Sequence, residues 1–490
     1  MQQLKLNISW TSLLLACMLC INYSFAQEDD AIAKDWQKMN ASKDQDYVDY
    51  NDAKFGMFIH WGAYSDLGGV WKGKKVPKLG EWIMYHGQIP RDEYREVCRN
   101  FNPVGFNAED WVKLAKDAGM KYIVAMTKHH DGFSLYNSDV TDFNIYDYTS
   151  FKRDPIAEIY EACKKYDIRL GLYYSHSIDW MDGGDAGYAQ EKKLNPDHDD
   201  HYGANLWDPS PFSYEEYFET KAKPQMREIL TKFPDLIEVW YDFPRFINRQ
   251  QSYEFYKLAY DIQPNCLICS RVGNYLGDFL TAGDNQIPTT ITTEYRTWET
   301  PGTLNNTWGY KCYDNDWKSF EEVLYWIVEI ASKGGNYLLN IGPDGKGYVP
   351  EESVKLLKQV GKWMAINGEA IYGTSRWETF REGPTRMEMK STTDREEHGF
   401  DLEFTPQDFW FTKKGNVVYA ISLSSELKDK LTIKSLSAVA PNIERIDILG
   451  NQQNLKWEAK NNIVDIWLNQ ADNTSEAFKN GLVLKVTFKE

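Results

Sequence analysis

The sequence predicts an α/β fold in which a (β/α)8-like barrel is followed by a C-terminal antiparallel β-sandwich. Up to about residue 368, short apolar runs rich in β-branched residues alternate with amphipathic stretches. That alternation is typical of a parallel sheet with right-handed helical crossovers. Beyond Tyr372 the helical stretches stop and short alternating runs follow one another, which is typical of a β-sandwich.

The expected barrel strands are apolar runs that end in polar or aromatic residues. In chain order they cover residues 55–61, 122–127, 169–175, 236–241, 267–271, 289–294 and 336–341. About seven such units are enough for the sheet to close into a barrel. An open, doubly wound sheet is the alternative, but no Gly-rich nucleotide loop follows any of these runs.

Helices are expected between the strands. Asn107 is an N-cap for a helix that carries Trp111 and Leu114 and ends near Gly119. The other expected helices cover residues 155–166, 214–232, 252–261 and 319–332. The sandwich strands are expected in the apolar runs that begin at residues 417, 431, 445, 462 and 482.

The N-terminus predicts export. Lys5, an apolar stretch from Trp10 to Ile21 and the small residues Ser24 and Ala26 form the three regions of a secretory signal peptide. We therefore expect a signal peptide over 1–26, cleaved after Ala26, a catalytic barrel over 27–368 and a sandwich over 369–490. The mature chain is expected to be periplasmic or secreted, and lipid attachment at Cys17 is the alternative.

Composition limits the possible partners. The formal net charge is −17 and no basic run offsets it, which disfavours binding to nucleic acid or to an anionic membrane surface. The apolar N-terminal stretch is too short for a comfortable membrane span, and no other segment reaches that length. The aromatic content of 15% is in keeping with stacking against sugars. The sequence leaves homo-oligomerisation open.

The cysteines do not predict a disulfide framework or a zinc site. Five of them follow the expected signal peptide, and their spacing is irregular. Cys266 and Cys269 form one Cys-x-x-Cys pair without a second pair, and they lie in an apolar run.

Polar and aromatic residues recur where the expected strands end. They are His60, Trp61, His129, His130, Tyr173, Tyr174, His176, Trp240, Asp242, Arg271 and Glu294. The carboxyl ends of parallel barrel strands form the ligand-binding face of such proteins. Histidines, tryptophans and a few carboxylates suit a neutral polyhydroxylated ligand, because they offer donors, acceptors and stacking faces.

A pair of carboxylates is the most economical chemistry for this set. Asp242 is one candidate, and Glu294 or Glu299 is the other. Cleavage of a glycosidic bond needs such a pair. No metal is expected, because His129 and His130 are adjacent and no His-x-x-x-His spacing occurs. A serine hydrolase is not expected either, because no Gly-x-Ser-x-Gly motif is present.

Several motifs together carry a family resemblance. They are Lys54-Phe-Gly-Met-Phe-Ile-His-Trp-Gly62, Gly80-Glu-Trp82, Lys128-His-His-Asp-Gly-Phe133, Gly171-Leu-Tyr-Tyr174, Trp240-x-Asp242, Trp298-Glu299, Trp308-Gly-Tyr310 and Gly334-Gly-Asn-Tyr-Leu-Leu-Asn-Ile-Gly-Pro343. Through these motifs the whole mature chain resembles glycoside hydrolase family 29, the retaining α-L-fucosidases.

The resemblance implies a barrel with a C-terminal β-sandwich, no cofactor, and exo-acting release of α-L-fucose from fucosylated glycans. It implies that Asp242 is the nucleophile. Glu294, which ends a strand-like run, is the expected general acid/base, and Glu299 is the second choice. The sugar contacts that it implies are His60, Glu81, Trp82, His129, His130, Tyr174, Trp240 and Arg271.

Two alternatives to an α-L-fucosidase remain open. One is a family member that acts on a related sugar such as an α-L-galactoside, which has an added hydroxyl on C6. The other is a sugar-binding relative without catalytic activity. A missing carboxylate would favour that relative, and none is missing.

Overall fold

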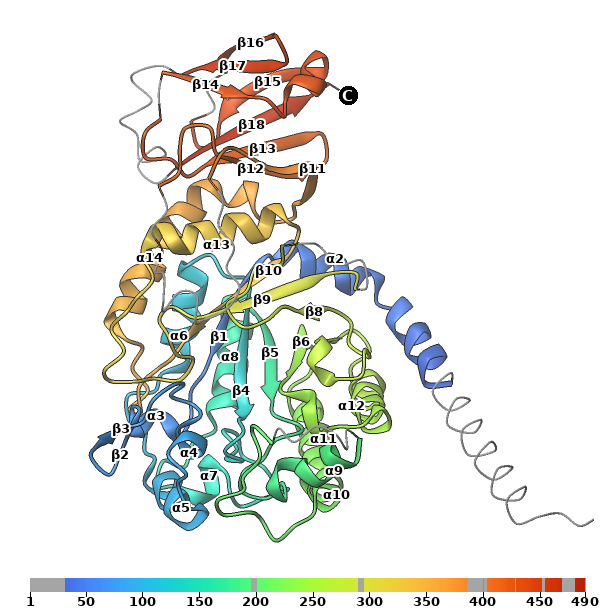
Figure 1. The fold of residues 1–490 in the computed structure, drawn as a ribbon, viewed down its shortest axis with the longest axis vertical. Coiled ribbons are helices and arrows are strands. Elements are labelled where there is room, and N and C mark those ends of the chain that lie inside the picture. The colour runs from blue at the N-terminus through green and yellow to red at the C-terminus, as the bar shows by residue number, and fades with distance from the viewer. Residues whose placement is uncertain are drawn as a thin grey trace, which may run out of the picture.

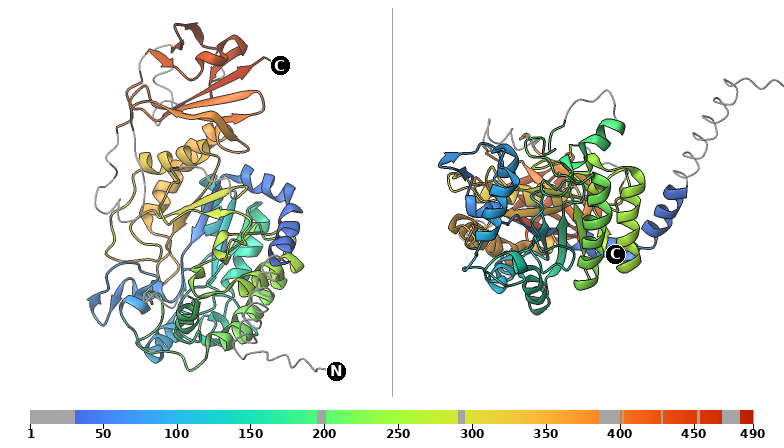
Figure 2. Two further views of the ribbon diagram at one scale, coloured as in Figure 1. Left: turned by 45° about the vertical axis from the view of Figure 1, so that its right-hand side comes forward. Right: turned by 90° about the horizontal axis from the view of Figure 1, so that it is seen from below.

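The computed structural model describes residues 31–194, 201–289, 295–385, 400, 403–427, 429–451, 454–468 and 481–489. A barrel forms the larger part of the molecule, and a smaller all-β region lies against one end of it (Figures 1 and 2). The expected signal peptide and most of the expected strand 289–294 lie outside these ranges. Among the described residues, no helix combines the length and apolar character needed to cross a membrane.

Eight parallel strands form the barrel sheet. They are β1 (Phe55–Ile59), β4 (Tyr122–Lys128), β5 (Arg169–Tyr174), β6 (Glu238–Tyr241), β7 (Leu267–Ile268), β8 (Leu280–Thr281), β9 (Trp298–Gly302) and β10 (Asn336–Ile341). Their order in space is β7-β6-β5-β4-β1-β10-β9-β8. A parallel bridge between Cys269 and Phe279 brings the outer strands β7 and β8 together. The predicted barrel-like fold is confirmed.

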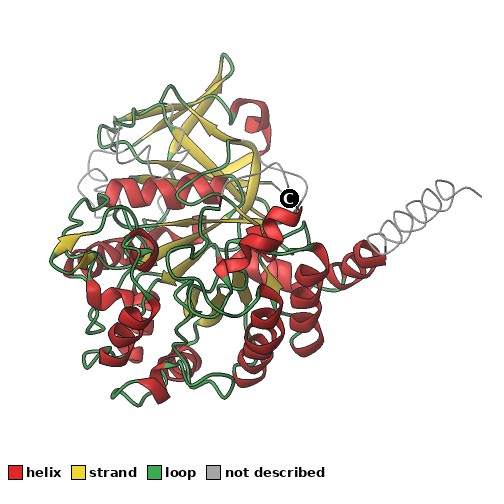
Figure 3. Ribbon diagram, turned by 60° about the horizontal axis from the view of Figure 1, so that its bottom comes forward, coloured by secondary structure: helices red, strands yellow, loops and turns green. Residues whose placement is uncertain are grey.

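Helices surround these strands (Figure 3). The main ones are α6 (Ala108–Asp117), α8 (Pro155–Tyr166), α11 (Lys223–Lys232), α12 (Arg249–Ile262), α13 (Phe320–Ser332) and α14 (Glu351–Asn367). As predicted, the Asn107 side chain caps α6 by accepting from the backbone N–H groups of Glu109 and Asp110. Ser319 caps α13 in the same way.

The region between β7 and β9 departs most from the expected alternation. β8 was not predicted, because a strand of two residues leaves no readable pattern. No helix separates β7 from β8. The chain instead makes a 3-10 turn at Ser270–Val272, which carries Arg271. Glu299 lies in β9 and is fully buried.

The C-terminal region contains two antiparallel sheets. One has the order β11 (Ser375–Glu382), β12 (Phe409–Lys414), β13 (Val417–Ser422), β18 (Leu482–Phe488) and β15 (Ile443–Ile448), and the other β14 (Lys430–Ile433), β17 (Ile463–Trp467) and β16 (Lys456–Lys460). Side chains from both sheets, such as Phe411 and Ile466, share one apolar core. The predicted sandwich is therefore confirmed. It rests on α13, where Trp410 donates a hydrogen bond to Glu329.

Candidate active site

A cavity of about 170 Å³ opens at the carboxyl ends of the barrel strands. It is lined by Phe58, His60, Leu79, Glu81, Trp82, His129, His130, Tyr202, Trp240, Asp242, Phe243, Arg271, Asp284 and Trp308. Its lining combines polar and aromatic side chains. A concave site of this size with a few converging polar groups suits a single small, polar ring.

Asp242 follows directly after β6 and projects into this cavity. Its Oδ1 accepts hydrogen bonds from Arg271 Nη1 and from the backbone N–H of Phe243, both at 2.8 Å. Its Oδ2 accepts from the hydroxyl of Tyr173 at 2.8 Å and lies 3.5 Å from His130 Nε2. The carboxylate is therefore held by three donors.

The surroundings of Asp242 keep it ionised. Burial on its own would raise the pKa of this carboxyl, but the charge of Arg271, the neighbouring His130 and two side-chain hydrogen bonds lower it below its ordinary value. An ionised carboxylate at the end of a strand can act as a nucleophile or stabilise a developing positive charge.

Arg271 joins Asp242 to a second carboxylate that sequence reasoning missed. Its Nη1 donates to Asp242, and its Nη2 donates to Asp284. Asp284 follows β8, and 43% of its side chain is exposed, compared with 13% for Asp242. Arg271 also lies 4.7 Å from the centre of the Trp240 ring, which supports the guanidinium from one side.

His60 and His130 both present a nitrogen that can accept a hydrogen bond. Asn340 donates through Nδ2 to the carbonyl of Trp308, so its Oδ1 accepts from His60 Nδ1 at 2.7 Å. Ser175 donates to the carbonyl of Ile178, so its oxygen accepts from His130 Nδ1 at 2.6 Å. In both rings the proton lies on Nδ1, which leaves Nε2 as an acceptor.

Burial keeps these imidazoles neutral. It lowers the pKa of His60 to about 3, that of His130 to about 4, and that of His129 well below its ordinary value. Adjacent residues in a strand point to opposite faces, yet both His129 and His130 line the cavity. The reason is that β4 ends at Lys128, so both histidines lie in the turn that follows, with ring centres 4.2 Å apart.

Glu81 and Trp82 reach the cavity from the segment after β3 (Lys74–Lys75). Glu81 accepts a hydrogen bond from the backbone N–H of Gly309 at 2.8 Å, and burial raises the pKa of its carboxyl to about 7. The Trp82 ring meets the His130 ring edge to face at 5.0 Å. Glu81 thus provides a buried acceptor beside an aromatic wall.

Comparison with known proteins identifies the family. A family model described as α-L-fucosidase matches residues 19–369, and one described as the α-L-fucosidase C-terminal domain matches residues 403–487. The chain belongs to the α-L-fucosidase family. The resemblance seen in the sequence motifs is thereby confirmed.

Individual relatives agree with this assignment. The chain is 29% identical to the tissue α-L-fucosidase of Homo sapiens over 460 residues, which cover 88% of this chain and 86% of that protein. An α-L-fucosidase from Vibrio sp. strain EJY3 superposes with a TM-score of 0.75 at 30% identity, covering 91% of this chain and 73% of that one. The α-L-fucosidase AlfC of Lactobacillus casei, solved in complex with α-L-fucose, is 38% identical with a TM-score of 0.61, covering 66% of this chain and 99% of that one.

Tyr174, expected to contact the sugar, requires a correction. It does not line the cavity, and its hydroxyl donates to Gln225 on α11 at 2.9 Å. Successive side chains of β5 point to opposite faces of the sheet. The neighbouring Tyr173 points inward instead and contacts Asp242. The structure therefore places Tyr173, and not Tyr174, next to the predicted nucleophile.

Glu299, the second choice for the acid/base, lies beneath the cavity rather than on its wall. It accepts hydrogen bonds from Tyr50 at 2.8 Å, Tyr122 at 2.7 Å and Trp240 Nε1 at 3.0 Å. In the sheet it pairs with Asn336, the first residue of β10. It is fully buried and does not line the cavity. The structure does not support Glu299 as the acid/base.

Glu294, the first choice, lies outside the described residues, so its position is not tested. Besides Asp284, sequence reasoning missed Leu79, Tyr202, Phe243 and Trp308, all of which line the cavity. Trp308 had been noted only as part of a motif. Most of the others lie in loops, where periodicity gives no signal.

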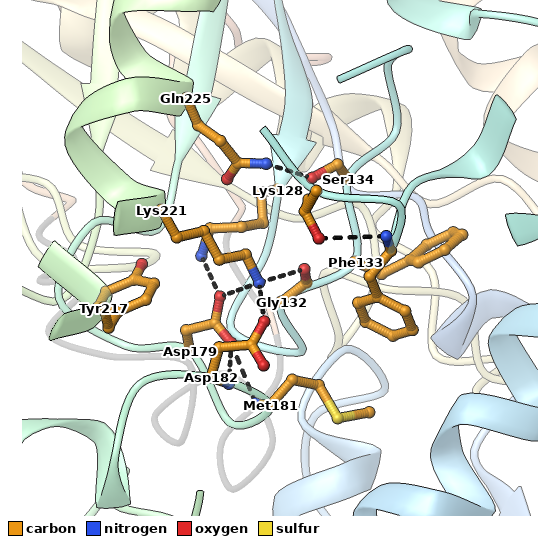
Figure 4. A network of polar contacts seen from close by, with 12 residues as sticks. Lys128, Gly132, Phe133, Ser134, Asp179, Met181, Asp182, Tyr217, Lys221 and Gln225 are labelled. Atoms are coloured by element: carbon orange, nitrogen blue, oxygen red, sulfur yellow. Dashed lines mark hydrogen bonds and ion pairs between the residues drawn. The ribbon is translucent and has the colours of Figure 1, made fainter. Parts of the chain in front are cut away.

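A buried network of charges holds the loop that carries His129 and His130 (Figure 4). Asp179 Oδ2 pairs with Lys221 at 2.8 Å and with Lys128 at 3.3 Å, and Lys221 also donates to the carbonyl of Gly132 at 3.1 Å. Gly132 has a φ of +74°, and a Cβ there would lie 2.4 Å from Asp179 Oδ1. Burial on its own would raise the pKa of Asp179, but the two lysines lower it to about 2.

Three cavity residues also lie close enough to share a cation. One ligand atom each of His129, His130 and Asp242 lie within 4.8 Å of one another. Arg271 already donates to Asp242 at 2.8 Å, and its positive charge disfavours a metal ion at this place. That the enzyme works without metal or cofactor stays a prediction, which chelation tests.

Proposed function

We propose that this protein releases terminal α-L-fucose from fucosylated glycans by a retaining double displacement, with Asp242 as the nucleophile. The observation that carries the proposal is the position of Asp242. In a chain of the α-L-fucosidase family, this ionised carboxylate ends a barrel strand inside a cavity of about 170 Å³, which has room for one sugar ring.

The polar side chains of the cavity suit the hydroxyl groups of the sugar. His60 and His130 offer Nε2 as acceptors, and Glu81 offers a buried carboxyl oxygen. The rings of Trp82 and Trp240, which line the cavity, offer apolar surface to the C–H groups of a pyranose. Neutral acceptors and few cations suit an uncharged sugar better than a phosphorylated one.

We infer that Asp284 is the general acid/base among the described residues. Three described carboxylates line the cavity: Glu81, Asp242 and Asp284. A retaining pair stands about 5 Å apart, and Arg271 holds Asp242 and Asp284 on its two terminal nitrogens, which enforces a short separation. Because 43% of the Asp284 side chain is exposed, its carboxyl group can leave Arg271 and contact the oxygen of the leaving group instead. Glu294 stays the rival prediction.

The reaction then runs in two balanced steps. In the first, an oxygen of Asp242 bonds to the anomeric carbon, the bond from that carbon to the glycosidic oxygen breaks, and the acid gives its proton to that oxygen. In the second, the same group, now a carboxylate, takes a proton from water. The water oxygen bonds to the anomeric carbon and displaces Asp242, so fucose leaves with its original configuration.

The experiment that tests this function is hydrolysis of 4-nitrophenyl α-L-fucoside, followed by proton NMR of the first sugar released. We expect turnover, with α-fucose appearing before its β anomer. β-Fucose as the first product would rule out the retaining mechanism. Parallel assays with the α-L-galactoside, which adds a hydroxyl at C6, test the related-sugar alternative. No turnover of either glycoside would favour a non-catalytic relative.

We also propose that the mature protein is exported, which rests on the predicted signal peptide at 1–26. Expression with its own N-terminus, cell fractionation and N-terminal sequencing of the product test this. A mature N-terminus at Gln27 is expected, and retention of the whole N-terminal segment in the cytoplasm would contradict it.

A further inference from the structure

The cavity has one wall made of apolar side chains. It consists of the rings of Trp82, Tyr202 and Phe243, all of which line the cavity. The ring centres of Trp82 and Phe243 are 5.6 Å apart, and those of Tyr202 and Phe243 are 6.3 Å apart. These side chains therefore form one continuous aromatic surface.

Tyr202 differs from the other aromatic residues of this wall by its exposure. It is 38% exposed, whereas Trp82 is 6% exposed. The two rings are stacked, with centres 5.2 Å apart and planes 14° from parallel. Trp82 thus supports Tyr202 from within the cavity, and Tyr202 carries the same flat surface outward to solvent.

The size of the cavity decides which part of a substrate can contact Tyr202. A space of about 170 Å³ that ends at Asp242 has room for one sugar ring. The group attached to the anomeric carbon must therefore lie outside, at the mouth. Tyr202 and Asp284 are the lining residues whose exposure places them at that mouth.

We propose that Tyr202, stacked on Trp82, is the platform for the leaving group of the fucoside, and that the preferred substrates carry a second pyranose with an apolar C–H face there. This inference rests on the proposed function and deepens it. A tyrosine ring offers a large, flat contact surface at a low cost in side-chain entropy, which suits stacking against a sugar. Asp284, which also lines the cavity, would act on the oxygen that joins the two sugars.

The test compares two substrates that share the fucosyl group. One is a fucosyl disaccharide whose second sugar is gluco-configured. The other is α-L-fucosyl fluoride, whose leaving group is too small to stack. We expect Tyr202→Ala to lower kcat/KM for the disaccharide roughly three- to tenfold, in line with the loss of one aromatic contact, and to leave kcat/KM for the fluoride within about twofold of wild type.

Matched variants separate the platform from other roles. Tyr202→Phe keeps the ring and should keep disaccharide turnover. Tyr275→Ala removes another exposed tyrosine, 79% exposed, which does not line the cavity, and should change neither substrate. Tyr202→Leu, apolar but without a flat ring, gives the same comparison should the alanine variant fail to fold in a thermal melt.

Three outcomes would overturn the inference. An equal loss on both substrates would mean that Tyr202 acts through Trp82 on the fucosyl group. An unchanged kcat/KM for the disaccharide would mean that its second sugar does not contact Tyr202. Wild-type protein that turns over neither substrate would refute the proposed function itself, and the platform with it.

Discussion

The indole nitrogen of Trp240 donates a hydrogen bond to the carboxylate of Glu299 at 3.0 Å. Trp240 lines the cavity, and Asp242 follows it by two residues, while Glu299 lies beneath both. Glu238, on the same strand as Trp240, faces Glu299 in the barrel core. Burial raises the pKa of both carboxyls, and the charge of Glu299 raises that of Glu238 further. The catalytic end of β6 thus rests on a buried acidic pair.

This pair predicts a pH-dependent stability. Burial raises the pKa of Glu299 from 4.5 to about 7. Below pH 4.5 the group is protonated in the folded and the unfolded chain. Between pH 4.5 and about 7 only the unfolded chain loses the proton, so the free energy of unfolding falls as the pH rises.

In Glu299→Gln this contribution disappears, and urea unfolding at pH 4.5 and pH 7 measures it. The exposed Glu352→Gln should behave like wild type, and parallel curves for wild type and Glu299→Gln would contradict the prediction.

Asp242→Asn should abolish turnover and keep the fold. The amide has nearly the same shape, but it is not a nucleophile, and loss of the nucleophile costs several orders of magnitude in kcat. Activity on 4-nitrophenyl α-L-fucoside and a circular dichroism melt provide the measurement. Retention of more than a few per cent of wild-type activity would show that the nucleophile is another residue.

The identity of the acid/base is tested by the dependence of the rate on the leaving group. An activated phenol departs without a proton, so a variant without the acid keeps activity on a dinitrophenyl fucoside and loses it on natural fucosides. We expect this pattern, with azide restoring rate, in Asp284→Asn. Glu299→Gln should lack it, because Glu299 is buried beneath Trp240. The same pattern in Glu294→Gln, and not in Asp284→Asn, would return the role to Glu294.

His129→Ala and His130→Ala should each weaken transition-state binding by about 2 to 4 kcal/mol, the usual cost of removing a polar contact in a closed site. The ratio of kcat/KM to that of wild type gives this energy. Pre-incubation with EDTA should leave wild-type activity unchanged. Loss of activity on chelation, restored by a divalent metal, would assign the three ligand atoms of His129, His130 and Asp242 to a metal.

Asp179→Asn should destabilise the barrel by about 3 to 5 kcal/mol, because it leaves Lys128 and Lys221 buried without their shared partner. The exposed pair of Glu161 with Lys164 gives the control, since Glu161→Gln should cost less than about 1 kcal/mol. Thermal and urea unfolding compare the two. Equal, small effects would mean that the network contributes little to holding the histidine loop.

The sequence by itself determined most of the fold. β1, β4, β5 and β10 begin where the apolar runs begin, and α8 has the bounds that its Pro155 and its apolar spacing predict. These features are local, because burial on one or both faces imposes a period on the chain. For the same reason the residues directly after long strands, His60, His129, His130 and Asp242, could be predicted to lie at one end of the barrel.

Only the tertiary structure decided which of two neighbouring candidates enters the site. Tyr173 and Tyr174 are equivalent in the sequence pattern, and the direction in which β5 faces the barrel interior separates them. Glu299 and Asp284 are separated by the direction of their side chains: the carboxylate of Glu299 points toward Trp240 in the barrel core, and Asp284, after the short strand β8, reaches the cavity. Direction and register arise from contacts between segments far apart in the chain, and no local pattern encodes them.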